Sequence, residues 1–198
     1  MAKIGLSKPY FAKYSNTGTT VTYTGGKLIG KAVSLDIALE DGDDSVLYAD
    51  NGPAETANTF NGGTATLTTD DLSPTTLMSV LGVTEETITS EDIQTETPKW
   101  YNWGEGQNTP YGGFGAIVMV QNNNVIGYQA IVLPKIKFNN LNDTFNTKGE
   151  SVEWGTPEIS ASILRDDTTA HNWKKLSSVL QTEAEAEAAI KQFLQIAE

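Results

Sequence analysis

The sequence predicts a mainly β fold of the α+β kind: a two-sheet β-sandwich or barrel with one short internal helix, a C-terminal helix and a long irregular loop. Three observations favour this class. A length of 198 residues fits one compact domain, spanning 1–198. Gly, Asn, Thr and Ser are plentiful, and helix formers are concentrated near the C-terminus. Several segments also alternate apolar and polar residues, as half-buried strands do.

The N-terminal third reads as three strands. Segments 10–14 and 20–23 flank a turn at Asn16-Thr17-Gly18 and form the first two. The third, 33–40, has the clearest period of two, because its apolar residues are Val33, Leu35, Ile37 and Leu39. We therefore expect a half-buried antiparallel strand that ends at the turn residues 41–44.

The next segment predicts a long loop, then a strand and a helix. Residues 48–63 show little periodicity, and a loop of this length in a small domain usually serves binding or assembly. A strand follows at 64–69. Ser73 is a good N-cap for a helix over 74–81, Pro74 suits its first turn, and Gly82 suits its end.

The C-terminal half predicts more strands and a second helix. Residues 85–108 read mostly as loop. Strands 116–121 and 125–133 should form a hairpin around Asn122-Asn123-Asn124, since asparagine tolerates positive φ. Strands at 135–138, 151–154 and 158–164 follow. Thr182 and Glu185 form a capping box for a helix over about 183–197.

Charge is unevenly distributed along the chain. The formal net charge is −12, and residues 32–98 carry 14 acids without a single Lys, Arg or His. Duplex DNA binding needs Lys and Arg to displace counterions, so this stretch is not expected to bind DNA. There is no cysteine, which excludes disulfides and cysteine nucleophiles. No apolar run has the length of a signal peptide or a membrane span, so we expect a soluble protein made in the cytoplasm.

The motifs predict no catalytic or metal site. The single histidine, His171, lacks neighbours at ligand spacing and is expected to lie at a chain turn. Residues 41–44 begin like a calcium loop but lack its later glycine and glutamate. The glycines of 104–106 and 112–115 complete no phosphate-binding pattern. The aromatics Trp100, Tyr101, Trp103 and Tyr111 could form a carbohydrate platform, although such groups more often pack a core or an interface. No cofactor is expected.

Several stretches in order along the chain resemble the phage major tail protein family, the tail tube proteins of long non-contractile siphophage tails. The region 100–111 carries the least of this resemblance. The matching segments are Gly5 to Tyr10, Ala12-Lys13-Tyr14, Tyr48 to Glu55, Gly63 to Pro74, Gly112 to Val120, Tyr128 to Phe138, Gly149 to Thr156, Leu164 to Asp167 and Thr182 to Ala188.

This resemblance implies a structural subunit of the virion and no enzyme. Six such subunits would close a ring, and rings would stack into a hollow tube through which DNA passes into the host. The subunit would be made in the host bacterial cytoplasm. Its partners would be other copies of itself, a tape-measure protein, a tail terminator and distal tail proteins, with no membrane. The family supplies no catalytic residues.

Two sets of residues are candidates for such assembly. A negative lumen would repel phosphate within about 8 Å at physiological salt, so DNA would slide without adhering. The candidate lumen-facing acids are Asp36, Glu40, Asp41, Asp43 and Asp44. The candidate inter-ring loop residues are Tyr48, Asp50, Asn51, Pro53, Glu55 and Phe60. Two alternatives stay open: a carbohydrate-binding β-sandwich module using the aromatics of 100–111, and a hydrolase with scattered carboxylates.

Overall fold

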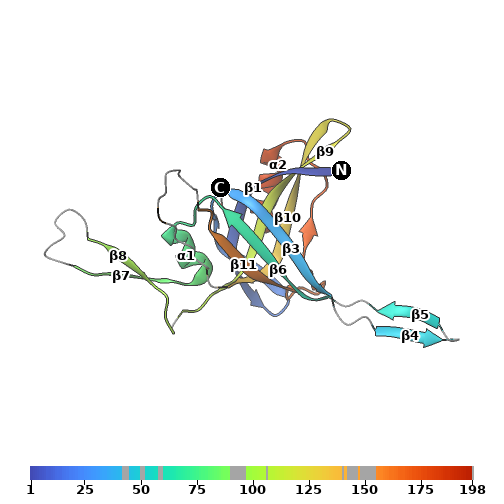
Figure 1. Ribbon diagram of the computed structural model, residues 1–198, viewed down its shortest axis with the longest axis horizontal. Coiled ribbons are helices and arrows are strands. Elements are labelled where there is room, and N and C mark those ends of the chain that lie inside the picture. Colours follow the sequence, from blue (N-terminus) through green and yellow to red (C-terminus); the bar gives the residue numbers. More distant parts are fainter. Residues whose placement is uncertain are drawn as a thin grey trace.

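A computed structural model describes residues 1–41, 45–49, 52–57, 60–89, 97–105, 107–139, 141, 147 and 155–197. Most strands join one antiparallel sheet in the order β2-β1-β9-β10-β11-β6-β3, and β12 pairs with β10 (Figure 1). Their bounds are β1 (Ala2–Thr17), β2 (Thr20–Leu28), β3 (Ala32–Asp41), β6 (Phe60–Thr69), β9 (Tyr111–Asn122), β10 (Val125–Phe138), β11 (Glu158–Leu164) and β12 (Lys175–Leu176).

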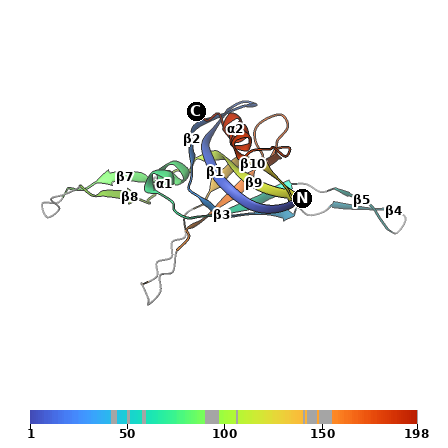
Figure 2. The ribbon, with the colours of Figure 1, turned by 90° about the horizontal axis from the view of Figure 1, so that it is seen from above.

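The sheet curls on itself, so that β3 packs close to β1. Its two layers are therefore parts of one continuous sheet, and the mainly β class with two helices is confirmed. The first core cluster fills the space between the layers and includes the fully buried Phe11, Leu67 and Leu133. Helix α1 (Pro74–Leu81) adds Val80 and Leu81 to this cluster and lies at one end of the sheet (Figure 2).

Helix α2 (Glu183–Phe193) covers the outer face of β1, β9 and β10 through a second core cluster that contains Ile117, Ile190 and Leu194. Glycines on β9 permit this close approach. A Cβ on Gly115 would lie 2.6 Å from Ile190 Cγ2, and one on Gly113 would lie 2.6 Å from Leu194 Cδ2. Such distances are too short for carbon atoms, so only glycine lets α2 sit this near the sheet.

The locally encoded elements are confirmed. Asn123 and Asn124 have φ values of 48° and 63° in the turn between β9 and β10. Ser73 caps α1 and Gly82 ends it in the left-handed conformation, as expected. The capping box of Thr182 is also present, but α2 stops at Phe193 and not near residue 197.

The predicted long loop at 48–63 is wrong, because it contains a hairpin, and the segment 85–108, predicted to be mostly loop, also contains a short one. The segment 48–63 overlaps the hairpin of β4 (Ser45–Ala49) and β5 (Gly52–Ala57), and Phe60 already begins β6. Within 85–108, β7 (Thr84–Thr87) pairs with β8 (Lys99–Asn102). The predicted strand 151–154 lies outside the described residues.

Acid is expected to weaken the attachment of α2 through Glu187. Hydrogen bonds from Lys8 Nζ (2.5 Å), Tyr10 Oη (2.6 Å) and Lys191 lower the pKa of Glu187 from 4.5 to about 2. Since the folded pKa lies below the unfolded one, this stabilisation is present above about pH 4.5 and is lost as the pH falls from about 4.5 to about 2. Glu187→Gln should lower the unfolding free energy by about 1–3 kcal/mol at neutral pH.

Chemical denaturation at neutral pH and at about pH 3 checks this prediction. Glu187→Gln should lose less stability on acidification than the unsubstituted chain, because it lacks the carboxylate that titrates. Glu158→Gln, at an exposed position of β11, is the control. Equal stability for both variants at neutral pH would contradict the role given to Glu187.

Candidate assembly surfaces

The outer face of β3, β6 and β11 is polar. Leu35, Leu67 and Ile159 pack in the first core cluster, so the residues that alternate with them point outward. The strand register places these outward residues in three rows: Ser34–Thr68–Glu158, Asp36–Thr66–Ser160 and Ala38–Thr64–Ser162. This face, called the hydroxyl–carboxylate face below, lies on the layer that α2 does not cover.

Two of the five candidate lumen acids have described side chains on this layer. Asp36 and Glu40 are exposed on β3 and share the outward phase of the strand. Asp41 pairs through its backbone with Phe60 at the end of β3, and Asp43 and Asp44 lie outside the described residues. The sequences of β3, β6 and β11 contain no base, so this face presents only hydroxyls, small side chains and carboxylates.

The β4–β5 hairpin extends the β3–β6 pair away from the body of the molecule (Figure 1). It carries three of the predicted inter-ring residues: Tyr48 pairs with Pro53, and Glu55 pairs with Leu47. The predicted residues Asp50 and Asn51 lie outside the described part of the chain. This hairpin is called the arm below.

Phe60, the sixth predicted inter-ring residue, packs within its own subunit at the root of the arm. Its ring stacks on Trp173 with centroids 4.9 Å apart and planes 8° apart. The Arg165 guanidinium lies 5.5 Å from the Phe60 ring centroid and donates from Nη2 to the Phe60 carbonyl oxygen at 2.8 Å. Lys174 lies 5.7 Å from the Trp173 ring centroid. This cation–aromatic stack joins the root of the arm to the segment before β12.

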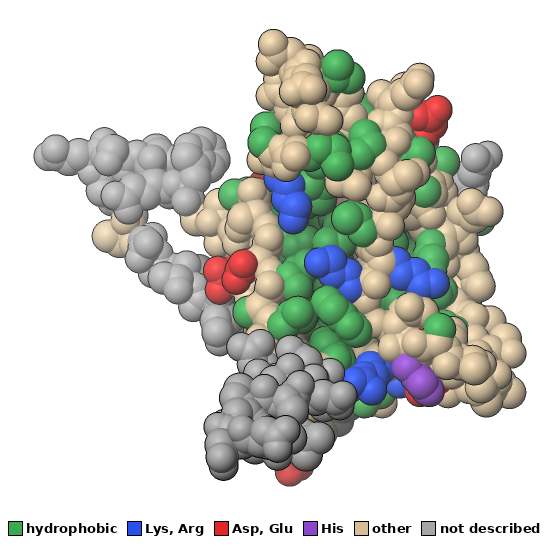
Figure 3. Space-filling view, turned by 90° about the vertical axis from the view of Figure 1, so that its right-hand side faces the viewer, with side chains coloured by type: hydrophobic (Ala, Val, Ile, Leu, Met, Phe, Trp, Pro, Cys, Tyr) green, Lys and Arg blue, Asp and Glu red, His purple; other side chains and the backbone are tan. Residues whose placement is uncertain are grey.

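A groove of about 510 Å³ runs along the seam where the curled sheet leaves β1 and β3 side by side. Its lining combines apolar and polar side chains: Lys3 and Lys174 are its two bases, and Ser34 and Asp36 also line it. Figure 3 shows apolar side chains running down the middle of the corresponding side of the molecule, with cationic side chains beside them. The apolar lining residues are Leu6, Val33, Leu35, Ile37, Leu39, Val118 and Ile131. We call it the seam groove.

The β7–β8 hairpin projects from the opposite side of the molecule (Figures 1 and 2). Tyr101 packs against the first core cluster, whereas Trp100 and Trp103 are exposed. Lys99 bonds Glu85 at 2.9 Å across the strand pair. Tyr111 begins β9, and the ammonium groups of Lys135 and Lys137 lie 5.2 and 5.4 Å from its ring centroid. The four predicted aromatics therefore differ in their surroundings.

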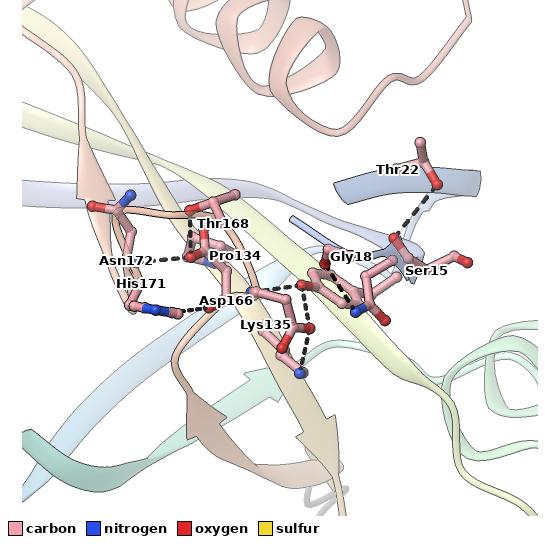
Figure 4. Close-up of polar contacts among 12 residues, drawn as sticks. Ser15, Gly18, Thr22, Pro134, Lys135, Asp166, Thr168, His171 and Asn172 are labelled. Carbon is pink, nitrogen blue, oxygen red and sulfur yellow. Dashed lines mark hydrogen bonds and ion pairs between the residues drawn. The ribbon is translucent and has the colours of Figure 1, made fainter. Parts of the chain in front are cut away.

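The loop 166–172 is held by a buried carboxylate. Asp166 Oδ1 accepts hydrogen bonds from Thr168 Oγ1 at 2.7 Å and from the Asn172 backbone at 2.8 Å (Figure 4). His171 lies in this turn with a φ of 48°, and its Nδ1 contacts the Asp166 carbonyl oxygen. The expectation of a histidine at a chain turn is confirmed. Among the described residues, no group of three or more His, Asp or Glu could hold a metal.

Asp167 links this loop to β1 and β10. Lys135 bonds its Oδ2 at 2.7 Å and lowers the pKa of the carboxyl group, aided by a hydrogen bond from Tyr14. Burial raises the pKa of the Tyr14 hydroxyl to about 12, so Tyr14 stays a neutral donor at physiological pH. Asp167, Lys135 and Tyr14 are therefore bonded to one another, and they attach the loop to the sheet.

Sequence reasoning missed the seam groove and the aromatic stack. Both combine residues more than 100 positions apart, such as Phe60 with Trp173, so no local sequence pattern predicts them. The exposure of Val33 and Leu39, at the ends of an apolar strand face, is visible only after folding.

No protein-family model matches the chain, and a comparison with curated proteins finds none that matches its sequence. Within the described residues, none of the helices has the length and hydropathy needed to cross a membrane.

Proposed function

We propose that this chain is a self-assembling structural subunit of a phage tail tube, which forms rings that stack around a channel for DNA. The observation that carries the proposal is the difference between the two outer faces of the curled sheet. One layer is covered by α2, while the other presents the hydroxyl–carboxylate face. A wall with such a face repels phosphate and offers no cation to bind it.

Unpaired edges give the subunit a reason to associate. Strands β2 and β3 end the sheet, and within the described residues no strand pairs with their outer edges. Natural β proteins cover such edges, because free backbone donors and acceptors recruit other strands. Contact between copies of this chain would cover them, and a head-to-tail contact that closes would make a ring.

Electron microscopy of the concentrated protein tests assembly directly, and we expect rings or tubes. Labelling then tests the lumen. Because the chain has no cysteine, Ser162→Cys and Ala188→Cys each introduce a unique thiol, on the hydroxyl–carboxylate face and on exposed α2 respectively. A bulky maleimide should label both in the monomer, but only Ala188→Cys in the tube. Equal labelling of both thiols in tubes would reject the lumen assignment.

A carbohydrate-binding module is the second candidate, favoured by the exposed indoles of Trp100 and Trp103. One experiment distinguishes the two candidate functions. Glycan binding by a protein that stays monomeric at every concentration, and loss of that binding in Trp100→Ala, would favour the module over the tube subunit.

A further inference from the structure

The seam groove lies where strand pairing in the curled sheet is incomplete. The β1 segment from Ala2 to Ser7 pairs with β9, while β2 joins β1 only from Tyr10 onward. The edge of this β1 segment therefore faces β3, whose own outer edge ends the sheet. Two apolar side chains at the groove stay largely in contact with water, since Val33 is 56% exposed and Leu39 is 46% exposed.

The β7–β8 hairpin carries the complementary chemistry on the opposite side. Trp100 is 54% exposed and Trp103 is 47% exposed, so both indoles are available to a partner. The sequence of 84–102 contains five acids and one base, whereas the groove is lined by two bases, Lys3 and Lys174, and one acid, Asp36. A groove of about 510 Å³ is within the size range of sites that enclose aromatic groups.

We propose that the seam groove of one subunit receives the exposed indoles of Trp100 and Trp103, on and just after β8, from a second copy. This inference rests on the proposed self-assembly and names the interface that closes the ring. The hairpin projects from one side of the molecule and the groove opens toward the other (Figures 1 and 3). Such an interface is head-to-tail, and every subunit then uses both surfaces once.

The positions of the two hairpins favour the β7–β8 hairpin over the arm as the segment that fills the seam groove. The arm leaves the molecule on the side where the seam groove opens, so it points away from the side that meets the next groove in a head-to-tail ring. The apolar surface agrees with the choice, because the exposed indoles would cover Val33 and Leu39. Aromatic anchors in apolar pockets are the usual energetic centres of interfaces.

Two double variants test the interface. Trp100→Ala with Trp103→Ala removes the hairpin surface, and Val33→Asp with Leu39→Asp charges the groove at exposed positions. We expect each variant alone to associate at least about tenfold more weakly than the unsubstituted chain in sedimentation velocity. Val125→Asp, on a residue 70% exposed at the β9–β10 turn and outside both surfaces, is the matched control and should assemble normally.

Mixing the two double variants provides the decisive measurement. Each keeps one intact surface, so an equimolar mixture should form a one-to-one dimer at concentrations where each variant alone stays monomeric. Circular dichroism melts of each variant show whether it is folded. If the unsubstituted chain never associates, the proposed function itself fails. If it assembles but the folded hairpin variant assembles as well as Val125→Asp, or the folded mixture stays monomeric, another segment fills the groove and this inference is wrong.

Discussion

Replacing Gly112 by alanine is expected to lower the melting temperature of this protein by about 6–12 °C. A Cβ at this position would overlap three ring carbons of Phe11, a side chain with no exposed surface. Phe11 also packs against Phe138, with ring centroids 5.7 Å apart, so it has little room to retreat. Overpacking of this kind costs about 3 kcal/mol, which corresponds to this temperature shift for a domain of about 200 residues.

Gly104→Ala is the matched control for this prediction. A Cβ on Gly104 would have nothing within 4 Å, and its φ requires no left-handed conformation. The same chemical change should therefore leave the melting temperature nearly unchanged or raise it slightly, because alanine reduces the freedom of the unfolded chain. Calorimetry of the two variants measures the difference. A similar melting temperature for both would mean that the core adapts around Phe11.

The glycines of β9 illustrate what the sequence can and cannot reveal. From the sequence, Gly112 and Gly113 could be excluded from a phosphate-binding pattern but not given a role. Their role depends on Phe11 and on Leu194, which lie about 100 and 80 positions away along the chain. By contrast, the caps of α1 and α2 and the turn at Asn123 depend on neighbours within four residues, and all three were predicted from the sequence.

The candidate assembly surfaces also combine features that follow from the local sequence with features that depend on distant residues. Alternation along β3 was enough to place Asp36 on one face of a strand, because the period of a strand is local. It could not say that the neighbours of Asp36 across the sheet would be Thr66 and Ser160, which makes the face continuous. Phe60 was predicted to be an inter-ring residue because its segment looked irregular. The structure shows a partner within its own subunit, Trp173, that the sequence did not indicate.

Replacing Trp173 by alanine is expected to destabilise the folded chain and to loosen the arm. The Trp173 ring stacks on Phe60 and lies 5.7 Å from the ammonium group of Lys174, so truncation removes both contacts at the arm root. Trp173 is half-buried, and its loss should cost about 2–3 kcal/mol, less than the truncation of a fully buried tryptophan. Arg165 would keep its hydrogen bond to the Phe60 carbonyl oxygen. The Phe60 ring that Arg165 lies over would, however, no longer be held in place by Trp173.

Hydrogen exchange separates the two effects. If the stack fixes the arm, the amides of β4 and β5 should exchange faster in Trp173→Ala, while those of β9 and β10 change only with global stability. Trp173→Phe should restore much of the protection, because phenylalanine can still stack on Phe60. Lys175→Ala, which removes a cation 5.1 Å from the Phe193 ring, tests a cation–aromatic contact away from the arm and should leave arm exchange unchanged. Unaltered arm exchange in Trp173→Ala would show that the arm takes its direction from the β3–β6 pairing alone.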